Sequence, residues 1–306
     1  MTADLSVAVG KVALRNPVLT ASGTFGYGIE YRDLADVSQL GGICTKGLSP
    51  KPRAGNAPPR IVETPAGMLN AIGLSNVGVD AFVAEKLPVL RDLGALVVAN
   101  VFGETEEEYL AVCRRLSASD AHGVAALELN LSCPNTEAGG LEFGVDAHRA
   151  SALVARCRST TTLPLWVKLS PEAADLAGVS RACEAAGADA LTVMNTIRGM
   201  AIDVHTRRAV LSRGAGGLSG PAIKPLAVRL VRDVSRAVKI PVVGIGGIST
   251  WKDVVEFVLA GATAIQVGTA CFVDPLAPWK CIEGLQRFCD EQKTNARDLV
   301  GAMLEG

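Results

Sequence analysis

Short apolar segments rich in β-branched residues recur along the chain, and each ends in a polar or glycine-rich stretch. Apolar residues three and four positions apart usually follow, which is the spacing of an amphipathic helix. Eight strands are expected, at residues 18–22, 42–46, 95–101, 126–132, 165–169, 190–195, 241–246 and 264–268. Helices are expected at residues 80–93, 104–116, 146–159, 172–186, 223–238 and 250–260.

This alternation of buried strands and helices is typical of a parallel sheet closed into a (β/α)8 TIM barrel. A doubly wound open sheet is the alternative. It is disfavoured because the first strand turn, at residues 21–24, carries no dinucleotide fingerprint, and no acidic residue is placed for a ribose. An N-terminal β-hairpin (residues 5–9 and 11–14) is expected to cap the barrel floor, and C-terminal closing helices are expected at 278–288 and 295–304. No linker is visible, so residues 1–306 are interpreted as a single domain.

Composition narrows the classes of partner. The chain has 306 residues, 49% of them apolar, and a formal charge of −1, so it has no strong field to attract nucleic acid or an anionic membrane. No signal peptide or membrane span is visible, which predicts a soluble, cytoplasmic protein. Eight scattered cysteines without Cys-x-x-Cys spacing, and only three histidines, favour free thiols and no metal site.

Glycines cluster where the last two predicted strands end. The seventh strand runs into residues 244–249 and the eighth into Gly268-Thr269, and a third cluster at 216–221 precedes a predicted helix. Glycines let backbone amides approach phosphate oxygens, and Ser249 is expected to cap the next helix. Loops at these strands of a TIM barrel commonly bind phosphate, although glycines in a tight turn have the same pattern.

Polar side chains end several other predicted strands. The fourth strand delivers Asn130 and then Cys133-Pro134, followed by a glycine-rich stretch at 136–141 that is a candidate lid. Lys46, Asn100, Lys168 and Asn195-Thr196 end the second, third, fifth and sixth strands. A lysine inside a barrel is costly unless it meets an anion, so these residues together predict an active site around Cys133.

The chain resembles the dihydroorotate dehydrogenases, and specifically the catalytic subunit of class 1B, over nearly its whole length. The matching segments are 45–47, 58–60, 63–65, 68–74, 130–135, 195–196, 217–225 and 244–248. The resemblance implies FMN-dependent oxidation of (S)-dihydroorotate to orotate in pyrimidine biosynthesis. Cys133 would be the base that takes a proton from carbon 5 while hydride leaves carbon 6 for flavin N5, with activity rising toward alkaline pH.

The resemblance also assigns binding residues. The substrate would be held by Lys46, Asn70, Ala71, Ile72, Gly73, Leu74, Asn130, Asn195 and Thr196. FMN would be contacted by Ser22, Lys46, Gly47, Asn100, Asn130, Lys168, Gly220, Gly246, Gly247, Gly268 and Thr269. Lys168 would lie near flavin N1 and O2, where a cation stabilises the anionic reduced ring.

Class 1B chains pass electrons to NAD through a second subunit that carries FAD and a 2Fe-2S cluster, and a homodimer associating with that subunit is expected. Class 1A, a fumarate-using homodimer, shares the cysteine; segments 58–60 and 136–140 favour class 1B. Class 2 enzymes use a serine and carry an amino-terminal membrane extension not seen here. Ser75, Val77 and Arg198 depart from the family pattern and bear on lid behaviour and partner docking.

Two further alternatives stay open. One is another FMN barrel reductase, acting on a pyrimidine or on uridine in transfer RNA. The transfer-RNA enzymes need a basic docking surface and usually an added helical domain. The other is a non-enzymatic barrel that only binds a phosphorylated ligand, for which Cys133 and Lys168 would be dispensable.

Overall fold

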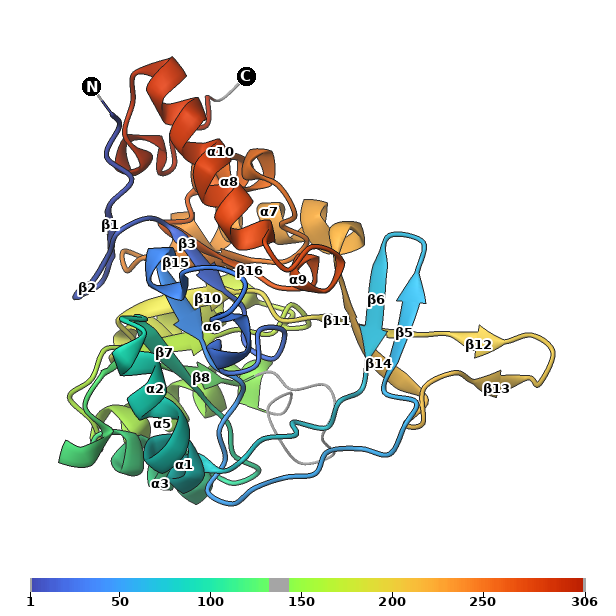
Figure 1. Cartoon of the computed structure of the whole chain (residues 1–306). Helices are drawn as coiled ribbons and strands as arrows, with labels where there is room; N and C mark the ends of the chain where they lie inside the picture. Colours follow the sequence, from blue (N-terminus) through green and yellow to red (C-terminus); the bar gives the residue numbers. More distant parts are fainter. Residues whose placement is uncertain (1, 132–142, 305–306) are drawn as a thin grey trace.

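A closed barrel of parallel strands forms the centre of the protein (Figure 1). The computed structural model describes residues 2–131 and 143–304. Neighbouring strands follow the order β10-β15-β16-β3-β4-β7-β8-β9. The barrel strands are β3 (Val18–Thr20), β4 (Gly42–Cys44), β7 (Val97–Val101), β8 (Val124–Asn130), β9 (Leu165–Lys168), β10 (Ala190–Val193), β15 (Val242–Ile245) and β16 (Ala264–Val267). All eight predicted strands are present, so the predicted TIM barrel is confirmed.

Seven of the eight barrel strands end one or two residues earlier than the sequence pattern indicates, and β7 ends at Val101 as expected. Ser22, Lys46 and Asn195 follow the last residues of β3, β4 and β10 and lie in loops. These side chains are polar and half-buried, whereas the strands that precede them are fully buried. The predicted end of the fourth strand, Ser132, lies outside the described residues. The polar residues therefore mark the rim of the barrel.

Helices between the strands form the outer layer (Figure 1). They are α1 (Val79–Ala81), α2 (Leu87–Asp92), α3 (Glu106–Leu116), α5 (Ala147–Arg158), α6 (Leu176–Ala185), α7 (Lys224–Ala237), α8 (Trp251–Ala260), α9 (Ala270–Val273) and α10 (Ala277–Gln292). Short 3-10 turns occupy Ile29–Tyr31, Val37–Gln39, Ser119–Ala121, Pro221–Ile223 and Ala296–Leu299. Several helices begin with a side-chain cap. In α3, α5 and α6 the side chains of Thr105, Asp146 and Asp175 each accept the backbone N–H of the residue three positions later.

Two helix predictions need correction. The expected helix at 80–93 is interrupted by a π-helical turn, Phe82–Lys86, just before Pro88, which cannot donate a backbone hydrogen bond. The first closing helix is α10, but the second, expected at 295–304, is only the 3-10 turn Ala296–Leu299. Gly301 follows with φ 71°, a left-handed conformation that ends helical winding. Within the described ranges, no helix is long and apolar enough to cross a lipid bilayer.

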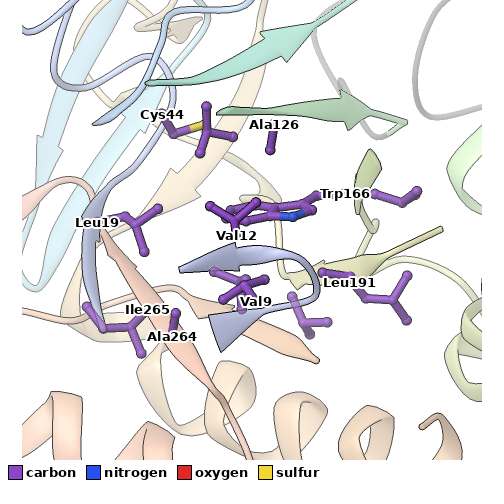
Figure 2. Packing of buried hydrophobic residues seen from close by; sticks show 14 of the residues in the cluster. Val9, Val12, Leu19, Cys44, Ala126, Trp166, Leu191, Ala264 and Ile265 are labelled. Atoms are coloured by element: carbon purple, nitrogen blue, oxygen red, sulfur yellow. The ribbon is translucent and has the colours of Figure 1, made fainter. Parts of the chain in front are cut away.

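The predicted hairpin is present as β1 (Val7–Val9) and β2 (Val12–Leu14), paired antiparallel around Gly10. A Cβ on Gly10 would lie 3.2 Å from the backbone oxygen of Asp189, which precedes β10. Val9 and Val12 belong to the same cluster of buried apolar side chains as Trp166, which is 0% exposed (Figure 2). The hairpin therefore closes the end of the barrel where the strands begin, as expected.

A second sheet was not predicted. Strands β5 (Ile61–Thr64), β6 (Gly67–Asn70), β11 (Ile197–Met200) and β14 (Ala215–Ser219) pair antiparallel in the order β11-β14-β6-β5. A ribbon of β12 (Ile202–Asp203) and β13 (Arg208–Ala209) projects beyond it (Figure 1). These strands belong to the segments that follow β4 and β10, which lie at opposite sides of the barrel. Their pairing joins two distant loops into one lobe at the carboxyl ends of the barrel strands.

Candidate active site

A cavity of about 370 Å³ lies between the carboxyl ends of the barrel strands and the antiparallel sheet. Its size falls in the range of small-molecule sites. The predicted site residues that line it are Ser22, Lys46, Gly47, Asn70, Ile72, Leu74, Asn100, Asn130, Lys168, Asn195, Thr196, Gly220, Gly246, Gly247, Gly268 and Thr269. The structure thus brings together residues from every part of the chain, and their individual roles stay predictions.

Two predicted residues, Ala71 and Gly73, are not on the cavity wall, and a third lies outside the described residues. Ala71 is fully buried and packs with Leu69 and Leu211 beneath the sheet. Gly73 is buried in a turn with φ 75°, where a Cβ would lie 2.7 Å from the backbone nitrogen of Asn56. Cys133, like the candidate lid at 136–141, lies outside the described residues. The strand that leads to Cys133 is described: β8 ends at Asn130, and the amide of Leu131 donates to the Lys168 oxygen at 3.3 Å.

The cavity also has a wall that the sequence pattern missed. Ile61 and Met68 come from β5 and β6, Ser219 from β14, and Phe272 from α9. Ile61 and Phe272 are exposed apolar side chains, 45% and 55% accessible. No local pattern distinguishes Ile61, because its place on the wall depends on the pairing of the second sheet; Phe272 reaches the wall from the short helix that follows β16.

Backbone rather than side chains forms the wall at the ends of β15 and β16. Gly220, Gly246 and Gly247 have φ of 94°, 131° and 76°, which few other residues adopt. A Cβ on Gly247 would lie 2.8 Å from the Gly220 oxygen, so these two segments are in close contact. Thr269 extends this wall and donates from Oγ1 to the Ser219 Oγ at 2.8 Å.

The predicted cap by Ser249 is wrong by one residue. Thr250 is the cap of α8, in a reciprocal capping box with Asp253. Asp253 Oδ2 accepts from the amides of Ser249 and Thr250 at 3.0 and 2.8 Å, and Asp253 Oδ1 pairs with Lys224 at 2.8 Å. The amino end of α8 is therefore already bound to a carboxylate of its own chain.

Lys168 is 5% exposed, and its Nζ donates to Ser22 Oγ at 3.4 Å. Lys46 lies elsewhere on the cavity wall, and burial, reinforced by the positive charge of Arg60, lowers its pKa below the usual 10.5, with Glu30 acting in the opposite direction. Within the described parts of the chain, neither lysine forms a salt bridge. Both cations are thus available to an anionic ligand.

Carboxamide side chains supply further donors and acceptors on the cavity wall. Asn195 Nδ2 donates to Asn130 Oδ1 at 3.4 Å, and Asn70 Nδ2 donates to the Gly217 oxygen at 3.2 Å. The backbone oxygen of Asn130 accepts from the Tyr109 hydroxyl at 2.7 Å, which fixes the end of β8. A planar ligand with amide groups would find matching partners here.

The loop that carries Leu74 has an unusual backbone. Leu74 has φ 55°, a left-handed conformation that costs a non-glycine residue free energy. Asn76 holds it there: Asn76 Nδ2 donates to the Leu74 oxygen at 2.9 Å and to Ser49 Oγ at 2.8 Å. Leu74 lines the cavity, so the unfavourable conformation places a side chain on the candidate site.

Fold and cavity together define a TIM-barrel enzyme with its site at the carboxyl ends of the strands. The chain belongs to the dihydroorotate dehydrogenase family, because the family model described as Dihydroorotate dehydrogenase matches residues 4–289. It is 55% identical over 307 residues to a protein of Trichlorobacter lovleyi, with 100% of both chains covered. It is 53% identical to a protein of Geotalea uraniireducens, with 98% of each covered. Both relatives are named dihydroorotate dehydrogenase B (NAD(+)), catalytic subunit, which confirms the resemblance to class 1B.

A solved structure gives the same fold. The crystal structure of dihydroorotate dehydrogenase from Eimeria tenella, in complex with ferulenol, superposes with a TM-score of 0.81. The match covers 98% of this chain and 88% of the other, at 23% identity. At that identity the likeness is evidence for the barrel architecture.

Proposed function

We propose that this protein oxidises (S)-dihydroorotate to orotate in pyrimidine biosynthesis, using FMN bound in the cavity and passing electrons to NAD through a partner subunit. Family membership and full-length relatives named as NAD-linked catalytic subunits support the reaction. The observation that carries the proposal is the single cavity that gathers both lysines, four asparagines and the glycine loops of β15 and β16.

The cavity residues fit FMN. Gly220, Gly246, Gly247, Gly268 and Thr269 would hold the phosphate through backbone amides. Lys168, buried and without an ion pair among the described residues, would supply a cation to the ring, and Ser22, Gly47 and Asn100 would contact its edge. When bound, FMN supplies the acceptor for a hydride from carbon 6 of the substrate.

The chain's own residues then bind and deprotonate the substrate. Lys46 would bind the substrate carboxylate, and Asn70, Asn130, Asn195 and Thr196 would hold the ring amides. Cys133, three residues past the end of β8, would take the proton from carbon 5. Its placement near the substrate is part of the proposal, because Cys133 lies outside the described residues.

The direct test is to purify the full chain, record its visible spectrum and add dihydroorotate without oxygen. A yellow chromophore that bleaches supports the proposal; a colourless protein that does not take up FMN would refute it. Replacing Cys133 by alanine is expected to keep FMN but to slow bleaching by about 10²- to 10⁴-fold, the range for a general base. Cys183→Ala, a buried cysteine of α6, is the matched control and should change the rate by less than about twofold. An unchanged rate in Cys133→Ala would reject the base assignment.

We also propose that the chain works in the cytoplasm as a homodimer bound to a subunit with FAD and a 2Fe-2S cluster. The catalytic-subunit names of the relatives support the need for a partner. The isolated chain is then expected to reduce artificial dyes with dihydroorotate but not NAD. Efficient NAD reduction by this chain alone would contradict the partner assignment, and rapid fumarate reduction would favour class 1A.

A further inference from the structure

A layer of polar side chains crosses the inside of the barrel directly below the cavity. Cys44, Glu128, Thr192 and Gln266 come from β4, β8, β10 and β16, the second, fourth, sixth and eighth strands of the barrel. All four residues are 0% exposed. Alternate strands contribute the four members of a TIM-barrel layer, and such layers are ordinarily filled by branched apolar residues. A carboxylate in this position needs an explanation.

Glu128 joins this layer together. Its Oε1 accepts from Cys44 Sγ at 3.2 Å and from Asn100 Nδ2 at 2.8 Å. Its Oε2 accepts from Thr192 Oγ1 at 2.8 Å and from Gln266 Nε2 at 2.6 Å. Every partner offers a hydrogen to Glu128, which is the arrangement that an ionised, acceptor-only carboxylate requires. The barrel therefore holds a buried negative charge beneath the cavity.

This charge orients one residue of the cavity wall. Asn100 lines the cavity, and its Nδ2 is held by Glu128. A Cβ on Gly47, which also lines the cavity, would lie 3.0 Å from Asn100 Oδ1. The hydrogen bond to Glu128 thus fixes the orientation of the carboxamide, with Nδ2 toward Glu128 and Oδ1 toward Gly47.

The same charge lies close to the buried lysine. Glu128 pairs with Trp166 in the β8–β9 register, so Lys168, two residues further along β9 on the same face, is its diagonal neighbour. Both charges act on the Cys44 thiol: besides burial, Glu128 raises its pKa and Lys168 lowers it. A cation and an anion that both lie inside the barrel attract each other more than they would in water.

We propose that Glu128 is a positioning residue for the flavin site: it fixes the Asn100 carboxamide and balances the charge of Lys168, so that both are presented to the ring in one arrangement. The inference rests on the proposed function, since it takes FMN as the ligand. Glu128 lies a layer below the cavity and is absent from the cavity wall, so it acts through Asn100 and Lys168.

The test is the reduction potential of bound FMN, measured by equilibration with reference dyes and therefore independent of dihydroorotate. Glu128→Gln removes the charge and keeps the shape. Gln266 Oε1 has no partner among the described residues, so its amide can turn to accept from the new side chain. The reduced flavin ring is anionic, so removing a nearby negative charge favours reduction. The equilibrium constant for two-electron reduction should rise at least about tenfold, which corresponds to a reduction potential about 30 mV higher.

Thr192→Val is the matched control, because it removes one hydrogen bond to Glu128 and leaves the charge. Its equilibrium constant should stay within about threefold of wild type, although the protein loses stability. An FMN-loaded Glu128→Gln protein with the wild-type potential would overturn the inference. The proposed function would stand in that case, provided that dihydroorotate still bleaches the wild-type flavin.

A second measurement covers a Glu128→Gln protein that folds poorly. If the two charges balance each other, Glu128→Gln leaves the charge of Lys168 buried without a counter-charge, and Lys168→Met should restore folding. The double variant of the full chain should then lose less free energy of unfolding than the two single variants lose in sum. We expect the difference to be at least about fivefold in the unfolding equilibrium constant. Additive losses, or no rescue of folding, would overturn the charge balance.

Discussion

The left-handed backbone at Leu74 gives a prediction whose magnitude follows from the structure. Leu74 has φ 55° and is held by Asn76. An L-residue with a Cβ pays about 1–2 kcal/mol for this conformation, whereas glycine pays none. Glycine in turn loses about 0.5–1 kcal/mol more through its greater freedom in the unfolded chain. Leu74→Gly should therefore be more stable than Leu74→Ala, by about 0.8 kcal/mol at the midpoints of these two ranges, which is the reverse of the usual order.

Equilibrium unfolding of the two variants in urea measures this difference, and each serves as control for the other because they differ by one methyl group. Both lose the same side chain from the cavity wall, so the KM for dihydroorotate should rise by a similar factor in each, about three- to tenfold for a half-buried leucine. The reasoning fails if Leu74→Ala is as stable as Leu74→Gly, since the loop would then not be held in the left-handed region.

Four further predictions concern Lys46, ligand binding, the cysteines and Gly217. Folding lowers the pKa of Lys46, so between the folded pKa and 10.5 the unfolded chain binds more protons than the folded one. The ligand-free protein should therefore gain stability as pH rises through this alkaline window. Urea titrations at several pH values should show the gain in the wild type and not in Lys46→Met. Orotate binding should weaken over the same window as Lys46 loses its charge, which calorimetry would detect. The seven cysteines among the described residues are all buried, and burial raises the pKa of Cys183, Cys271 and Cys281 to about 12. Iodoacetamide near neutral pH should therefore modify Cys133 first, as read by peptide mass spectrometry; earlier labelling of another cysteine would contradict this. A Cβ at Gly217 would lie 2.1 Å from Thr196 Oγ1, so Gly217→Ala should lower the free energy of unfolding by about 1–3 kcal/mol. The displaced Thr196 should raise KM by a larger factor than kcat falls. A wild-type KM would show that Thr196 does not bind substrate.

Local patterns in the sequence were sufficient to predict the barrel. Each barrel strand is buried on both faces, so it appears as an apolar run, and the amphipathic helices have the opposite pattern. The polar residue after each run and the glycines after β15 and β16 are equally local signals. Since parallel strands of one barrel end at the same rim, residues as far apart as Lys46 and Asn195 could be assigned to one site before any contact was known.

The second sheet and the hydrogen bonds of Glu128 could be known only from the tertiary structure, because both depend on pairing between distant segments. The strands of the second sheet are short and half-exposed, and β6 meets β14 across 147 residues, as in the bond from Asn70 to Gly217. No periodic signal marks such strands, so Ile61 and Met68 on the cavity wall were missed. Glu128 appeared in the sequence only as a polar residue in an apolar strand; its four hydrogen bonds from four other strands exist because the barrel closes. Local chemistry fixes where strands and loops form, whereas the partners of a buried charge are fixed by the closure of the chain around it.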